Sequence, residues 1–186
     1  MARWQCGQLP EVLSHDVIDI SFFAAFAEQT SALAGSAIEV PALADMDEGE
    51  LDQPITYVPN RNMMLLSMAA AFAESKGSTQ LYYGAQAQDE YGYWDCTEDF
   101  VDRINQVLAL NRRNAVQVIA PFTKMRKSEE LSLGIGLGVD LAHTWTCYRG
   151  GEKACGVCPS CIERLKAFEE VGHSDPLSYA SMGLED

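Results

Sequence analysis

Residues 147–161 read Cys-Tyr-Arg-Gly-Gly-Glu-Lys-Ala-Cys-Gly-Val-Cys-Pro-Ser-Cys and place four cysteines at the spacing C-x7-C-x2-C-x2-C. Four thiolates this close in sequence can complete a tetrahedral shell around one zinc ion. Gly156 allows a tight turn after Cys155, and Pro159 can start a helix that carries Cys161. The run therefore predicts a structural zinc site with a full sulfur shell and no position for a catalytic water. Its predicted ligands are Cys147, Cys155, Cys158 and Cys161.

Two other states of these cysteines remain open from the spacing alone. The first is a disulfide pair or a set of buried free thiols. The second is an iron–sulfur cluster, because C-x2-C-x2-C also opens the ferredoxin run. That run continues with x3-C-P, whereas Leu165 stands at the corresponding position here, so the spacing favours zinc.

Length, charge and cysteine content limit the class of protein. The chain of 186 residues suits one domain with a small metal-bound appendage, and we expect a substrate-binding α/β part over 1–142 and a zinc-binding segment with a helix over 143–186. The net charge of −14 argues against nucleic-acid binding. The sequence contains no run of about 18 apolar residues and therefore predicts no membrane-spanning helix. Cysteines at metal spacing favour the cytoplasm over a secreted disulfide scaffold.

Short β-branched runs alternate along the chain with segments of helical periodicity. This alternation predicts an α/β layered fold with a parallel sheet. Ser21, Asn62 and Ser128 are the predicted helix caps, and Gly77 is a predicted C-terminal cap. The predicted strands are 15–20, 80–83 and 116–120, and the predicted helices are 21–33, 62–76, 97–111, a glycine-loosened segment from 128, and 159–171.

The loop between Gly84 and Cys96 is a candidate ligand site because it follows a predicted strand, where α/β folds place their ligands. Carboxylates beside aromatic rings suit a flat, hydrogen-bonding heterocycle such as a purine. The residue types alone are equally consistent with an ordinary surface loop rich in turn formers. The residues concerned are Asp89, Tyr91, Tyr93, Trp94 and Asp95.

Two groups of basic and polar residues are candidates for binding phosphate. Arg61 and Asn62 precede an apolar helix, and helix N-termini bind phosphate, to which arginine adds a bidentate fork. A salt bridge with an ordinary N-cap explains the same residues. Lys124, Arg126 and Lys127 form a basic cluster in an acidic chain, and a solvated face is the alternative.

Taken together, these motifs resemble the 7-cyano-7-deazaguanine synthases, a queuosine-biosynthesis family of the N-type ATP pyrophosphatase (PP-loop) superfamily. The resemblance runs from about Val12 to the C-terminus. The matching segments are Val58-Pro59-Asn60-Arg61-Asn62, Gly84-x4-Asp89-x3-Tyr93-x-Asp95-Cys96 with Phe100, Pro121-Phe122 followed by Lys127-x-Glu129, Thr144-Trp145-Thr146-Cys147-Tyr148, and Cys155-Gly156-x-Cys158-x-x-Cys161 with Arg164.

The resemblance implies a partial doubly wound parallel sheet, adenine nucleotide alpha hydrolase-like, with the zinc segment at its C-terminal side. It implies a ligase that uses ATP and ammonia to convert 7-carboxy-7-deazaguanine to 7-cyano-7-deazaguanine, with zinc as a structural ion. A homodimer is the implied assembly. The implied substrate contacts are Asp89, Tyr93 and Asp95 for the heterocycle, and Arg61, Asn62 and Lys127 for phosphate or carboxylate.

The chain departs from the family pattern at several points. Asn60 and Trp94 stand where the family usually has Gly and Pro, and the family's ATP loop Ser-Gly-Gly-x-Asp-Ser does not occur in the 186 residues. We therefore expect the C-terminal portion of a synthase, inactive by itself, with a complementing chain as the possible source of the loop. The alternative is a zinc-stabilised homologue without catalysis that binds a deazapurine or a partner.

Overall fold

The computed structural model describes residues 1–35, 37–46, 54–87 and 92–180. Within these ranges the chain forms two compact units, one from residues 1–46 and 131–186 and the other from residues 47–130. We refer to them as the cysteine unit and the sheet unit, respectively. The division into residues 1–142 and 143–186 that the sequence predicts stays a prediction.

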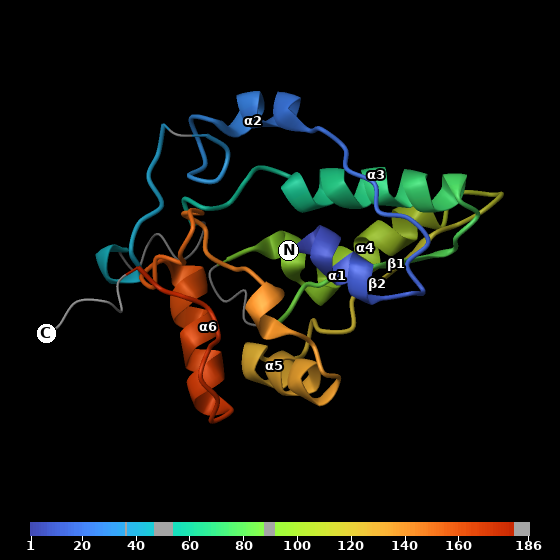
Figure 1. Cartoon of the computed structure of the whole chain (residues 1–186). Helices are drawn as coiled ribbons and strands as arrows, with labels where there is room; N and C mark the ends of the chain where they lie inside the picture. Colours follow the sequence, from blue (N-terminus) through green and yellow to red (C-terminus); the bar gives the residue numbers. More distant parts are fainter. Residues whose placement is uncertain (36, 47–53, 88–91, 181–186) are drawn as a thin grey trace, which may run out of the picture. The chain divides into compact units, whose positions relative to one another are not determined.

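The sheet unit is built on two parallel strands, β1 (Gln80–Tyr82) and β2 (Gln117–Ile119), with Leu81 opposite Val118. Two helices, α3 (Arg61–Ser75) and α4 (Glu98–Leu108), lie against the strands (Figure 1). Both contribute apolar side chains to a core shared with the strands. Burying these side chains is the main stabilising term of the unit. The core residues are Leu66, Phe100, Val101 and Val118. The sequence-predicted parallel pairing is confirmed for these two strands.

An asparagine side chain closes one edge of this small sheet. Asn105 of α4 accepts a hydrogen bond from the Val118 N–H at 2.8 Å and donates one to the Val118 carbonyl at 2.9 Å. The primary amide thus replaces a neighbouring strand at the outer edge of β2. On β1, the outward-facing backbone groups of Tyr82 have no partner among the residues that the structure describes. The sheet is therefore capped on one side only.

Helix α3 begins differently from the sequence prediction. Asn60, not Asn62, is the N-cap, and it adopts a left-handed conformation with φ of 54°. Asparagine tolerates this conformation better than most residues, because its short amide can bond locally. Asn62 lies inside the first turn and is buried. The predicted C-terminal turn at Gly77, with φ of 73°, is confirmed.

The next two helices start with side-chain caps. Thr97 accepts a hydrogen bond from the Phe100 N–H at 3.2 Å and so caps α4, as its residue type favours. Helix α5 (Lys127–Gly136) begins one residue before the predicted cap Ser128. The Arg126 N–H instead donates to the Glu129 carboxylate at 2.7 Å, so a reaching glutamate caps this helix.

The cysteine unit consists of short elements joined by long connections. Trp4 of the first helix stacks on His143 with ring centroids 3.7 Å apart, which ties the first residues of the chain to residues 141–143. The final helix begins with Pro159 and ends before Gly172, as the sequence predicts. The described elements are α1 (Ala2–Gln8), α2 (Ser21–Ala27), η1 (Leu43–Asp45), η4 (Leu141–His143) and α6 (Pro159–Glu170).

The N-terminal segment corrects two sequence predictions. Residues 15–20 are not a strand; Val17 and Ile18 are 70% and 58% exposed, since no described strand lies beside them to pair. Helix α2 ends at Ala27 and not at 33, and its first N–H, that of Ser21, donates to Asp19 at 2.8 Å, so Ser21 is not the cap. No described helix combines the length and apolar character needed to cross a membrane.

Replacing Asn105 with Ala should lower the free energy of unfolding of the sheet unit by about 2 kcal/mol, because Val118 would lose a donor and an acceptor at once. Urea unfolding followed by far-UV circular dichroism measures the change. Gln106→Ala, an exposed neighbour on the same helix, is the matched control and should change the free energy by less than about 0.5 kcal/mol. Equal effects of the two substitutions would contradict the role of Asn105.

Candidate functional site

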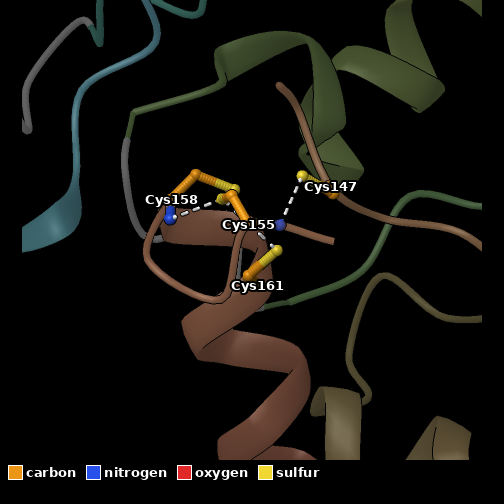
Figure 2. Close-up of side chains that lie close together, drawn as sticks. All are labelled: Cys147, Cys155, Cys158 and Cys161. Carbon is orange, nitrogen blue, oxygen red and sulfur yellow. Dashed lines mark hydrogen bonds between the residues drawn. The ribbon is translucent and has the colours of Figure 1, made fainter. Parts of the chain in front are cut away.

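The four cysteines predicted to bind metal converge in the cysteine unit (Figure 2). Their sulfur atoms all lie within 4.8 Å of one another, and the Cys155 and Cys161 sulfurs are 3.9 Å apart. Tetrahedral zinc with Zn–S bonds of about 2.3 Å would need sulfurs about 3.8 Å apart. The cluster therefore has the dimensions of a four-thiolate metal shell before any ion is added.

Local backbone structure gives each sulfur its direction. Gly156 has a φ of 76°, so the chain turns sharply after Cys155 as its sequence predicts. Cys158 is the N-cap of α6, and Cys161 lies in the first turn of the same helix. The Cys155 N–H donates to the Cys147 sulfur and the Cys158 N–H to the Cys155 sulfur, each at 3.3 Å. Such bonds favour thiolates over thiols.

Burial and hydrogen bonding act on the thiols in opposite directions. Burial raises the pKa of Cys158 and Cys161, whose side chains are fully shielded from solvent. Burial also acts to raise the pKa of Cys155, but backbone N–H groups of Val157 and Cys158 outweigh it and lower that pKa to about 7. All six cysteines of the chain are free thiols, so the structure forms no disulfide at this cluster. A soft, divalent cation suits this donor set.

A second cluster lies in the sheet unit, where the start of α3 meets η3 (Trp94–Cys96). Asp95 is 2% exposed, and Asn62 donates a hydrogen bond to the Cys96 sulfur at 3.5 Å. Tyr83, directly after β1, donates to the Asp95 carbonyl at 2.9 Å. The carboxyl end of a parallel strand is where α/β folds assemble ligand sites.

Asp95 is the electrostatic centre of this cluster. Burial raises the pKa of its carboxyl group, while the nearby Arg61 guanidinium and hydrogen bonds from Asn62 counteract only part of that effect. Arg61 in turn donates to the Asn62 amide oxygen at 3.4 Å. A buried carboxyl group with a raised pKa in a polar cluster is typical of a functional position.

Aromatic side chains hold residues 56–60, which lead into α3, against Tyr93 and Trp94 at the start of η3. The Trp94 indole donates to the Tyr57 hydroxyl at 3.0 Å, and the same hydroxyl accepts from the Asn60 N–H at 3.1 Å. The hydroxyl groups of Thr56 and Tyr93 hydrogen-bond to each other in the interior. These contacts hold the left-handed Asn60 and the start of α3 against η3.

The predicted site residues fall into three groups. Arg61, Asn62 and Asp95 come together, and Tyr93 lies two residues from Asp95 with its ring buried. Lys127 is the first residue of α5 and is half-buried, whereas the nearby Lys124 pairs with Glu98 at 2.9 Å on the exposed face. The predictions for Asp89 and Tyr91 lie outside the described residues.

Sequence reasoning missed four contributors to this cluster. Tyr83 and Cys96 are not among the predicted site residues, yet the Tyr83 hydroxyl lies 3.5 Å from the Cys96 sulfur. Thr56 and Tyr57 lie between Pro54 and Pro59, in a stretch for which the sequence predicts neither helix nor strand. The place of Tyr83 at the carboxyl end of the predicted strand 80–83 is the one signal that could have identified it.

Comparison with known proteins gives one family for nearly the whole chain. The family model described as queuosine biosynthesis protein QueC matches residues 3–172. A "7-cyano-7-deazaguanine synthase 1" of Colwellia psychrerythraea is 43% identical over 94% of this chain and 77% of its own length. Proteins named 7-cyano-7-deazaguanine synthase from Caldicellulosiruptor saccharolyticus and Trichodesmium erythraeum are 43% and 44% identical over 89% and 79% of this chain, and 71% and 68% of their own lengths.

In metal-free protein, Cys155 should be the thiol of the cluster that reacts fastest with iodoacetamide near neutral pH. Its pKa of about 7 leaves about half of it as nucleophilic thiolate there, whereas burial raises the pKa of Cys158 and Cys161. Mass spectrometry of peptides alkylated between pH 5 and 9 should give a Cys155 profile with its midpoint near 7. A midpoint near the value of an ordinary thiol would contradict this assignment.

Asp95→Asn should raise the free energy of unfolding at pH 7. The raised pKa means that the folded state binds the proton more tightly than the unfolded state, so Asp95 costs stability as pH rises through its folded pKa. The gain should shrink toward pH about 4, where the carboxyl group is increasingly neutral in both states. Urea titrations at both pH values measure it, with the exposed Asp102→Asn as control. Destabilisation at pH 7 would mean that Arg61 outweighs the burial.

Proposed function

The chain belongs to the queuosine biosynthesis protein QueC family, and on this premise we propose that it carries the substrate- and metal-binding part of a 7-cyano-7-deazaguanine synthase. The reaction converts 7-carboxy-7-deazaguanine and ammonia to the nitrile at the expense of ATP. ATP first activates the carboxylate, and ammonia displaces the activated oxygen to give an amide. A second activation then removes water from the amide and leaves the nitrile.

The observation that carries this proposal is the buried Asp95 of η3, which interacts with Arg61 and Asn62 and accepts a hydrogen bond from Tyr83 at the end of β1. We assign Asp95 to the hydrogen-bond donors of the heterocycle, because a desolvated carboxylate strongly rejects ligands that leave it unpaired. Tyr93, with its hydroxyl held by Thr56, lines the same pocket wall in this proposal. Asp89 completes the proposed heterocycle contacts.

The charged ends of the reactants need cations. Arg61 and Asn62 stand in the first turn of α3, where the helix dipole favours anions and the Arg61 guanidinium adds a positive charge. We assign them to the carboxylate of the deazapurine or to phosphate. Lys127, at the start of α5, is assigned to phosphate. Arginine can hold a carboxylate with two parallel hydrogen bonds, which orients it for attack by ammonia.

We assign one zinc ion to Cys147, Cys155, Cys158 and Cys161, with a structural role. The sulfur separations suit a closed tetrahedral shell. The alternative, a ferredoxin-type iron–sulfur cluster, would need a cysteine at the position of Leu165. A filled four-sulfur shell supplies no Lewis-acid position for substrate, so the ion holds the fold and the chemistry belongs to the sheet unit. A homodimer, as in the family resemblance, is the proposed assembly.

The metal assignment predicts about one zinc per chain by elemental analysis. Cys158→Ser should lose the zinc and lower the free energy of unfolding of the cysteine unit, since metal binding contributes directly to folding free energy. Cys6→Ser, a cysteine outside the cluster, should keep the full zinc content. Detection of iron together with a visible absorption band would contradict the zinc assignment and indicate an iron–sulfur cluster.

The substrate assignment predicts that calorimetry detects 7-carboxy-7-deazaguanine binding and that Asp95→Asn weakens it about tenfold to a hundredfold. Asp102→Asn should bind like the wild type, and it excludes a general effect of lost negative charge. Equal affinity of both variants would remove Asp95 from the site.

The catalytic assignment is tested by nitrile formation from the same substrate, ammonia and ATP. The 186 residues contain no Ser-Gly-Gly-x-Asp-Ser loop. We expect turnover only when a polypeptide with that loop is added, because backbone N–H groups around the phosphates carry the activation steps. Turnover by the 186 residues alone would contradict this requirement. Intact binding without turnover in either condition would favour a deazapurine-binding protein.

A further inference from the structure

A buried ion pair between Arg164 and Asp175 lies next to the cysteine cluster along α6. Arg164 lies one helical turn after Cys161 on α6 and is 6% exposed. Its Nε and Nη2 atoms donate to the two carboxylate oxygens of Asp175 at 2.6 and 2.9 Å. Burial acts to raise the pKa of Asp175, but Arg164 and Tyr179 hold it below its ordinary value, so the pair stays charged. Two-point pairing fixes the plane of the guanidinium group.

The remaining donors of Arg164 reach the segment that precedes Cys147. Its Nη1 donates to the Thr144 hydroxyl at 2.9 Å, and its Nη2 also donates to the Leu141 carbonyl at 3.2 Å. Thr144 lies three residues before Cys147 in the chain. One side chain of α6, the helix that carries Cys158 and Cys161, thus holds the approach to the first cysteine.

Asp175 holds the third segment through the residues that follow it. It accepts hydrogen bonds from the Leu177 N–H at 3.0 Å and from the Tyr179 hydroxyl at 2.5 Å. Tyr179 pairs with Ala154 in a parallel bridge, in which the Ala154 N–H donates to Ser178 at 3.0 Å and its carbonyl accepts from Ala180 at 2.8 Å. Ala154 directly precedes Cys155.

We propose that Arg164, Asp175 and Tyr179 are positioning residues that hold the three cysteine-bearing segments at metal-binding spacing and so set how firmly the centre keeps its ion. All three segments meet at the Arg164–Asp175 pair. Arg164 belongs to α6 and bonds Thr144 on the approach to Cys147, and Asp175 bonds Tyr179, which pairs with the residue before Cys155. Preorganised sulfurs pay no further ordering entropy when the ion enters. The inference rests on the proposed metal site and names the residues that preorganise it.

The test uses two mild substitutions that each remove one hydroxyl from the network. Tyr179→Phe loses the bond to Asp175, and Thr144→Val loses an acceptor of Arg164. Tyr82→Phe and Thr79→Val make the same chemical changes at exposed positions of the sheet unit and are the matched controls. The full chain is loaded with Zn²⁺, and transfer of the ion to an excess of chromophoric chelator is followed. Equilibrium competition with Co²⁺ measures affinity and, from its visible bands, the number of sulfur ligands.

Both network variants should release Zn²⁺ about tenfold faster and bind Co²⁺ about tenfold more weakly than their controls, as changes beside metal ligands do. The four-sulfur cobalt spectrum should be retained, because no ligand is removed. The release rate should not change with urea added below the unfolding transition, whereas release through global unfolding would accelerate. Release and affinity equal to the controls, or acceleration by urea, would overturn the proposal. A wild-type chain that binds neither ion would instead overturn the proposed metal site itself.

Discussion

The convergence of four sulfur atoms within 4.8 Å is the constraint on which the cysteine unit depends. Its helices are short, and many of its apolar side chains, such as Phe22 and Phe26, are exposed. Small units with little apolar burial need disulfides or metals to offset the entropy of ordering the chain. The unit concentrates its shielded groups around Cys158, Cys161 and α6, so the proposed metal ion would substitute there for a larger hydrophobic core.

The sheet unit, in contrast to the cysteine unit, is stabilised by a hydrophobic core. Its apolar core forms between α3, α4 and the two strands, and this core gives it a scaffold on which a costly group can be held. Asp95 is that group, since its carboxylate is desolvated and only partly compensated by Arg61 and Asn62. Proteins tolerate such unfavourable electrostatics where a ligand completes the pairing. In the proposed substrate site, stability and ligand recognition would therefore conflict at this one residue, while the surrounding aromatic contacts keep it in place.

Local signals in the sequence predicted local structure well. The cysteine spacing, the turns at Gly77 and Gly156 and the start of α6 depend on neighbours a few residues away, and all agree with the structure. The segment 15–20 shows the limit, because a strand needs a partner strand that its own residues cannot supply. The same holds for the second cluster: Tyr83 meets Cys96, and Tyr57 meets Trp94, through tertiary packing that no spacing rule encodes.

The Asn105 amide gives the two-stranded sheet a direction of growth. The amide occupies both outward hydrogen-bonding positions of Val118, so no further strand can pair with β2 on that side. An additional strand would have to pair with β1, at the outward-facing backbone groups of Tyr82. A parallel strand that docks there would deliver its carboxyl end next to Tyr83, whose hydroxyl contacts Asp95. Extension of the sheet and extension of the polar cluster around Asp95 would then be one event, because β1 and Tyr83 take part in both.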